Sequence, residues 1–352
     1  METPLIEVHR ALEARLAEHD GSVLPEEFAG FEKEYHAAQE SVVLFDTNWH
    51  AIFTLAGRDR VKYLHAVSSN DIKSLAEGQG TLALLLNPQG RILAELAVYA
   101  LAEKLLVLSH ASLREQTLAT LRKYVIGSQV QIEDLTDKLG SMAVEGLRAA
   151  EVATEALGVA LGEVAETSVR EIMVDAVPCY ALRRPYFGKA TVEILVPREA
   201  LPALWGKLLA AVREHGGEPI GIRALNSLRL EAGIPWFPAD FNDGMIPHEA
   251  AIENTHISFN KGCYTGQEIV ERVRSRGHVN RKRVSLKFST QAPPAVGTKL
   301  RAGDADVGFV TSAAYSPAAG SAIGMGYVRR EHFPPGSTVE FDGGTAEVRS
   351  QE

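Results

Sequence analysis

A single cysteine in a basic stretch is the most chemically suggestive feature of this sequence. Cys263 lies in the segment Lys261-Gly262-Cys263-Tyr264-Thr265-Gly266-Gln267-Glu268. Residues 261–283 carry seven basic and two acidic side chains, which gives a net charge of +5 in a chain of net charge −9. Nearby cations favour the thiolate, which is both a nucleophile and a ligand for soft metals. The competing interpretation is a buried packing cysteine, since free cysteines are often small core residues.

The sequence predicts no complete metal site in the isolated chain. An iron–sulfur cluster usually needs about four ligands, so Cys263 could only share a cluster with ligands from a partner or a second copy. His248-Glu249-Ala250-Ala251-Ile252 comes close to a zinc-protease helix motif, but Ile252 stands where the second histidine is needed. Phosphate-loop and nucleophile-elbow motifs are absent as well.

Composition narrows the class of protein. The net charge of −9 argues against general nucleic-acid binding, which needs a basic face. Two cysteines are too few for a disulfide scaffold and fit a reducing compartment, so we expect a cytoplasmic protein. The N-terminal segment is too charged for a secretory signal, and we find no apolar run long enough to cross a membrane.

Hydrophobic periodicity and turn residues predict a mixed α+β chain with a β-rich end. Amphipathic spacing predicts helices over residues 5–19, 57–67 and 198–215. Leu82–Leu86 is expected to be a buried strand that ends in the turn Asn87-Pro88-Gln89-Gly90, and strands over 92–99 and 104–109 are expected to form a hairpin. After Arg283, short alternating runs between Gly and Pro turns predict a small all-β domain.

The cysteine segment and several others resemble a known family. Residues 261–268, followed by Arg272 and Val279-Asn280-Arg281, are very similar to the KGCYxGQE signature of the YgfZ family, folate-binding relatives of the glycine-cleavage T-protein that include iron–sulfur assembly factors. Residues 228–235 with Asp240, and Pro247-His248-Glu249-Ala250, resemble further stretches of that family. The resemblance to the T-protein runs from about residue 40 to the end, and residues 308–328 resemble its C-terminal β-domain.

This resemblance implies a fold and a division into domains. It implies an α+β, T-protein-like arrangement of three domains around a central folate pocket, with a small C-terminal β-barrel. We expect residues 1–45 with 141–225 to form one α+β domain, residues 46–140 with 226–280 to form the folate-binding α+β domain, and residues 281–352 to form the β domain.

The resemblance also implies ligands and site residues. The expected cofactor is tetrahydrofolate or a derivative, and a pterin needs a carboxylate or amide at its donor edge and apolar or aromatic walls. Glu193 is the candidate for the pterin edge, with Arg229, Tyr186 and Asn87 as further folate contacts. Glu193 as a plain strand carboxylate and Arg229 as an ion-pair residue are the competing interpretations. Around Cys263, the signature makes Lys261, Gln267, Glu268 and Arg272 the candidate site residues.

One departure bears on the activity. T-protein enzymes carry two aspartates, one of them catalytic, where this chain has Ala94-Glu95. We therefore expect a tetrahydrofolate-binding accessory protein for iron–sulfur cluster assembly or repair that acts through Cys263 with a carrier or client protein, and that is not itself an enzyme. The alternative is a folate-dependent aminomethyltransferase or related one-carbon transferase in which Glu95 replaces the aspartate. A binding module that no longer holds folate is a third possibility.

Overall fold

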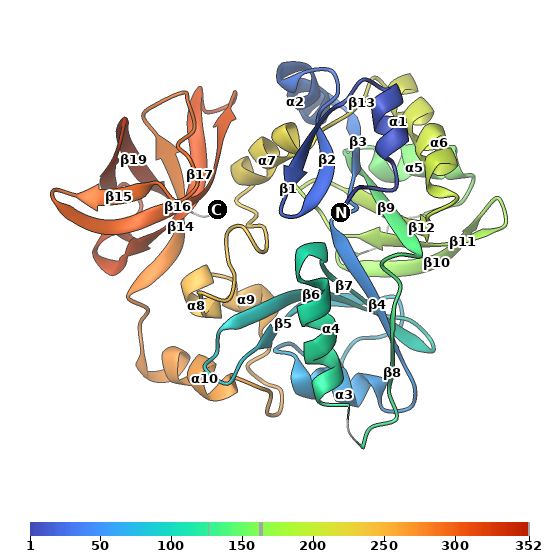
Figure 1. The fold of residues 1–352 in the computed structure, drawn as a ribbon, viewed down its shortest axis with the longest axis horizontal. Coiled ribbons are helices and arrows are strands. Elements are labelled where there is room, and N and C mark those ends of the chain that lie inside the picture. Colours follow the sequence, from blue (N-terminus) through green and yellow to red (C-terminus); the bar gives the residue numbers. More distant parts are fainter. Residues whose placement is uncertain (126, 162–164, 351–352) are drawn as a thin grey trace.

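The structure, a computed structural model, describes residues 1–125, 127–161 and 165–350. Three groups of elements surround a central region (Figure 1). Two of them are built on mainly antiparallel sheets with helices against them, β13 (Glu218–Pro219) being paired in parallel with β3 (Val42–Asp46), and the third is a closed barrel. Within the described residues, no helix is long and apolar enough to span a membrane.

The first group is built on a six-stranded sheet that draws strands from distant parts of the chain. Its order is β10 (Ser168–Val174), β11 (Val177–Arg183), β12 (Thr191–Pro197), β9 (Leu139–Gly146), β3 (Val42–Asp46) and β13 (Glu218–Pro219). Because side chains alternate along a strand, β3 packs Val42 and Leu44 on one face and Val43 and Phe45 on the other. The first face is covered by α1 (Ile6–Ala11), α5 (Ala149–Leu157) and α6 (Leu201–Glu214), and the second by α2 (Phe31–Glu40) and α7 (Ile222–Glu231).

The second group is built on a five-stranded sheet of order β5 (Gly80–Leu86), β6 (Ile92–Ala100), β7 (Lys104–His110), β4 (His50–Ala56) and β8 (Gln131–Asp134). One face packs against α3 (Arg60–Val67) and α4 (Arg114–Lys123), which follows the short helix η1 (Ala111–Leu113). On the other face Ile52, Tyr99 and Leu108 pack against Val169 and Leu182 of the six-stranded sheet, so the two sheets share a core.

The third group is a closed barrel of β14 (Arg281–Phe288), β17 (Ser321–Arg329), β16 (Ala305–Ser316), β15 (Lys299–Ala302), β18 (Thr338–Phe341) and β19 (Gly344–Arg349), with η2 (Arg330–His332) after β17. The connection from α7 to the barrel carries α8 (Pro247–Ala250), α9 (Glu253–His256) and α10 (Gln267–Arg276). Its apolar side chains pack with Leu86 of β5 and Tyr327 of β17, so this connection joins the barrel to the five-stranded sheet.

The predicted C-terminal β domain and α+β class are confirmed, and the strand at Leu82–Leu86, the 92–109 hairpin and the helix of α6 lie where they were expected. The single helix over residues 5–19 is wrong. The helix stops at Ala11, Glu13 has a φ of 57°, and the chain continues as a hairpin of β1 (Arg15–His19) and β2 (Ser22–Glu27). The three proposed domain boundaries stay a prediction.

Candidate functional site

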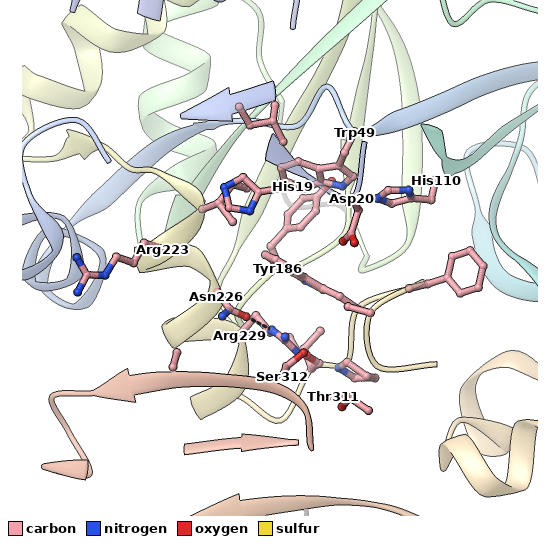
Figure 2. Close-up of a pocket in the computed structure, with 18 of the residues that line it drawn as sticks. His19, Asp20, Trp49, His110, Tyr186, Arg223, Asn226, Arg229, Thr311 and Ser312 are labelled. Carbon is pink, nitrogen blue, oxygen red and sulfur yellow. Dashed lines mark hydrogen bonds between the residues drawn. The ribbon is translucent and has the colours of Figure 1, made fainter. Parts of the chain in front are cut away.

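A cavity of about 550 Å³ lies where the three groups of elements meet. Such a volume lies within the range of small-molecule sites in proteins. The β1–β2 hairpin contributes His19 and Asp20, and α7 and the barrel contribute Asn226 and Ser312. Figure 2 shows these side chains around a common space, together with Trp49, His110 and Tyr186. The cavity is therefore assembled from segments that are far apart in the sequence.

Glu95 places a carboxylate in the wall of this cavity. Its neighbour on β6, Ala94, points to the opposite face and is buried in the core against α3 and α4. Glu95 Oε2 lies 3.1 Å from Arg184 Nη2, and Oε1 lies 2.9 Å from His256 Nε2. Burial alone would raise the pKa of this carboxyl, but Arg184 and His256 outweigh that effect and lower the pKa to about 2. Glu95 is therefore ionised at neutral pH and paired on both oxygens.

Tyr186 separates the predicted pterin-edge residue from the cavity. Tyr186 Oη donates to Glu193 Oε2 at 2.8 Å and lies 2.9 Å from His50 Nε2. Glu193 is fully buried and is not part of the cavity wall, whereas His50 and Tyr186 are. The prediction that Glu193 itself faces a ligand is therefore corrected: its carboxylate holds the Tyr186 hydroxyl, because that hydroxyl stands between it and the cavity. Glu193 Oε1 lies 3.2 Å from Nε2 of His50, the other wall residue, so both carboxylate oxygens contact a side chain of the wall.

Aromatic rings form one side of the cavity. The ring centroid of Trp49 lies 6.1 Å from that of Trp236 and 5.7 Å from that of Tyr186. Both tryptophans are partly exposed and line the cavity, and they also pack against the core formed with α2 and α7. At these distances the rings contact one another, so they form a continuous aromatic surface on which a planar heterocycle can pack.

Arg229 lines the cavity, but its Nε and Nη1 atoms already donate hydrogen bonds within the protein. It is ion-paired with Asp240, its Nε donates to Asn226 at 2.9 Å, and its guanidinium lies 4.9 Å from the centre of the Trp236 ring. Asp240 also accepts hydrogen bonds from Thr311 and Ser312 of the barrel. Arg229 therefore joins α7, the 236–240 segment and the barrel, which is the ion-pair interpretation; a direct ligand contact would be an additional role.

A buried carboxylate holds the turn that presents Arg184 and Tyr186. Glu145 of β9 is fully buried and accepts hydrogen bonds from the backbone N–H groups of Tyr186, Phe187 and Lys189 at 2.8, 2.9 and 3.0 Å. Burial raises the pKa of this carboxyl to about 7 even though the three N–H groups lower it.

His110, at the end of β7, places a neutral imidazole in the cavity wall. The backbone N–H of Ser112 donates to His110 Nδ1, so Nε2 carries the ring proton. Burial, with a smaller effect of His50, lowers the pKa of His110 to about 4. His110, His50, Trp49 and Arg184 were missed from the sequence, because no local pattern marks a side chain whose partners come from other sheets.

The Cys263 segment lies outside the cavity. None of Asn87, Lys261, Cys263, Gln267, Glu268 or Arg272 belongs to the cavity wall among the described residues. Asn87 does not meet a ligand there; its side-chain oxygen accepts from the backbone N–H groups of Gln89 and Arg91, which fixes the turn. That turn packs on the cysteine segment, since a Cβ at Gly266 would lie 2.6 Å from the Asn87 carbonyl oxygen.

Lys261 serves the fold rather than the thiol. Its ammonium donates to the backbone carbonyls of His65, Ser68 and Asn70 and lies 5.0 Å from the centre of the Tyr264 ring. Burial lowers the pKa of Lys261 to about 8, so the side chain stays charged at neutral pH.

Cys263 is exposed, which overturns the packing interpretation. Several of the cations counted around it are held elsewhere: Arg281 by Glu249, Arg283 by the Ala250 carbonyl, and Arg274 over the Phe259 ring. Gln267 opens α10, and Glu268 and Arg272 lie on that helix with exposed side chains. No group of three or more potential metal ligands occurs among the described residues.

Two descriptions of known protein families match this chain. The GCVT N-terminal domain matches residues 5–261, and the glycine cleavage T-protein C-terminal barrel domain matches residues 281–350. The chain belongs to the glycine cleavage T-protein family. The first match covers the two sheets and the cavity residues between them, and the second covers the barrel.

Relatives of this T-protein family member extend over almost the whole chain. The aminomethyltransferase of Rubrobacter xylanophilus is 30% identical over 329 residues, 94% of this chain and 87% of the relative. That of Caldanaerobacter subterraneus is 26% identical over 341 residues, 96% of this chain and 90% of the relative. The crystal structure of glycine cleavage system aminomethyltransferase T from Bartonella henselae has a TM-score of 0.91 at 27% identity and covers 99% of this chain and 97% of its own. These relatives are named as enzymes, which favours the transferase alternative over the accessory role.

Proposed function

We propose that this T-protein family member binds tetrahydrofolate, or a derivative of it, in the central cavity and acts in one-carbon transfer of the aminomethyltransferase kind. The observation that carries the proposal is the ionised carboxylate of Glu95 in the wall of a cavity that also has aromatic sides. The names of the full-length relatives support the same assignment.

The residues present fit a reduced folate. Trp49, Trp236 and Tyr186 offer flat apolar contacts for a pterin ring, and His110 offers a ring N–H as a neutral donor. Glu193 is buried behind Tyr186 and His50, and its carboxylate orients the Tyr186 hydroxyl that the wall presents to a ligand. Arg223, at the hairpin side of the cavity, is ion-paired with Glu27 of β2, so a carboxylate tail would share this guanidinium with Glu27.

Bound tetrahydrofolate would supply the nitrogens that accept the one-carbon unit. Glu95 is ionised and paired with Arg184 and His256, so it is poorly suited to take up a proton at neutral pH. Its charge is instead suited to stabilise positive charge that develops in the cavity. Arg184 and His256 hold the carboxylate in place.

The direct test is formation of methylene-tetrahydrofolate by the full-length protein, supplied with tetrahydrofolate and an aminomethyl-loaded amine donor. The proposal predicts turnover that Glu95→Gln reduces by at least about tenfold, the usual lower range for loss of a catalytic charge. Folate binding without any turnover would remove the transferase activity and leave a folate-binding protein.

A second candidate function is favoured by one observation, the exposed thiol of Cys263 beside the folded turn at Asn87. On this proposal the protein is a YgfZ-type cytoplasmic accessory factor that binds folate and assists iron–sulfur cluster assembly or repair, with Cys263 meeting a carrier or client protein. Any cluster contacted there would be shared, because the described residues place no second thiol beside it.

This second candidate is tested in a deletion strain by assaying iron–sulfur enzymes after complementation with wild type or Cys263→Ser. Loss of rescue with Cys263→Ser, at unchanged protein level and folate affinity, would support it. Full rescue would remove Cys263 from the function. A rescue defect from Glu95→Gln alone would instead favour the transferase.

A further inference from the structure

An arginine-lined hollow lies apart from the folate cavity, where the start of β14 meets the end of β17. Its volume is about 570 Å³, and it shares no wall residue with the central cavity. Its wall is formed by the four arginines Arg91, Arg281, Arg329 and Arg330, together with Glu249, Glu331, His278 and Asn280. With histidine neutral, the balance of four cations and two carboxylates is +2.

The backbone forces two of these arginines together. Arg281 of β14 and Arg329 of β17 are directly paired across the antiparallel strands. Like charges at such positions repel each other, and this destabilises a sheet unless an anion lies nearby. Glu249 provides one on the Arg281 side, since Oε1 lies 3.0 Å from Arg281 Nε and Oε2 lies 3.3 Å from Arg91 Nη1.

The other side of the hollow has no such compensation. No hydrogen bond or ion pair of the Arg329 and Arg330 side chains occurs among the described residues, and both are exposed. Glu331, the remaining carboxylate of the wall, is likewise exposed and makes no described ion pair. The Arg329 and Arg330 guanidinium groups therefore line the hollow without a described ion pair to any of its carboxylates.

We propose that this hollow is a binding site for a phosphate-bearing small molecule. The planar guanidinium forks of arginine match phosphate oxygens, and a phosphomonoester carries a charge of about −1.5 to −2 at pH 7 that balances the net +2 of the wall. The hollow is open to solvent and its wall is polar, so a ligand there would be held by charge and hydrogen bonds rather than by enclosure. The ligand source is either free phosphate or pyrophosphate, or a mononucleotide, and the test separates these.

The test is calorimetric titration of the full-length protein at low ionic strength with pyrophosphate, adenosine monophosphate and citrate in separate arms. We expect saturable binding of at least one phosphate probe, weakened at least about tenfold in Arg329→Gln/Arg330→Gln, since two charge-assisted hydrogen-bonding groups are lost. Tighter binding of the nucleotide than of pyrophosphate would assign a nucleotide. The matched control is Arg58→Gln/Arg213→Gln, which removes two exposed arginines outside the hollow and leaves the affinity unchanged.

A second variant changes the charge of the wall in the opposite direction, and the increase in affinity that it predicts could not result from misfolding. Glu331→Gln removes a negative charge from the wall without breaking a described bond, so it tightens phosphate binding. The proposal is overturned if no phosphate probe binds saturably, if citrate binds as tightly as the phosphates, or if the arginine and Glu331 variants bind like the wild type.

Discussion

Glu95 Oε2 lies 3.1 Å from Arg184 Nη2, and this contact joins the five-stranded sheet to the turn after β11 of the six-stranded sheet. His256, from the connection to the barrel, holds the second oxygen of the same carboxylate. The partly buried carboxylate that β6 places in the cavity wall is thus fixed by side chains from two other parts of the fold. Its place beside the aromatic wall makes the cavity suited to a ligand that gains positive charge.

Replacing Arg184 by Gln is expected to raise the pKa of Glu95 by about one to two units, because the larger of the two stabilising charges is lost. A carboxyl with a lowered pKa stabilises the fold above its unfolded value of 4.5, and this stability is lost as the pH falls through about 2. At acidic pH, the free energy of unfolding should therefore change less steeply with pH in Arg184→Gln than in the wild type. Carboxyl NMR titration measures the pKa itself, with Arg170→Gln as the control; an unchanged Glu95 titration would show that Arg184 does not hold it.

Replacing Glu145 by Gln is expected to remove a different pH dependence. The folded pKa of Glu145 is raised to about 7 from 4.5, so its contribution to stability is full below pH 4.5 and is lost as the pH rises through about 7. The full effect is at most about 3 kcal/mol. Denaturant unfolding from pH 5 to 8 should show a weaker decline in the variant than in the wild type. Parallel curves for the variant and the wild type would contradict the assignment. Glu151→Gln, at an exposed position of α5, is the control.

Replacing Lys261 by Met is expected to destabilise the protein by about 2–4 kcal/mol, because three backbone carbonyls lose their shared donor. Cys263→Ser, two residues away and exposed, should change the unfolding free energy by less than about 0.5 kcal/mol. Chemical denaturation of both variants tests this contrast. Equal unfolding free energies of the Lys261→Met and Cys263→Ser variants would mean that the three hydrogen bonds of the Lys261 ammonium do not stabilise the fold.

Tyr186→Phe and Glu193→Gln are each expected to weaken folate binding by about tenfold, a typical effect of losing one buried hydrogen bond to a charged group. Since Glu193 acts through the Tyr186 hydroxyl, the double variant should lose little more than either single one. Calorimetry on the four proteins gives the coupling. Additive losses would indicate that Glu193 reaches the ligand independently.

Local patterns in the sequence could predict the strands of β5 to β7, the helix of α6 and the barrel, because periodicity and turn residues decide them. The same periodicity misled at residues 5–19. Leu5, Val8, Leu12 and Leu16 are spaced like a helix, yet Leu16 belongs to β1, where the hairpin closes over the cavity. Glu95 was found from its place in a motif, whereas Arg184, His110 and Trp49 become site residues only once the two sheets pack together.

The most direct measurement is titration of the full-length protein with tetrahydrofolate, followed by tryptophan fluorescence and by calorimetry. Two of the three tryptophans, Trp49 and Trp236, line the cavity. The account predicts saturable one-to-one binding with a change in fluorescence that is reduced in Trp49→Leu, and an affinity that is unchanged in Cys263→Ser. The absence of saturable binding, or binding that Trp49→Leu and Tyr186→Phe leave untouched, would contradict the assignment of the cavity as a folate site.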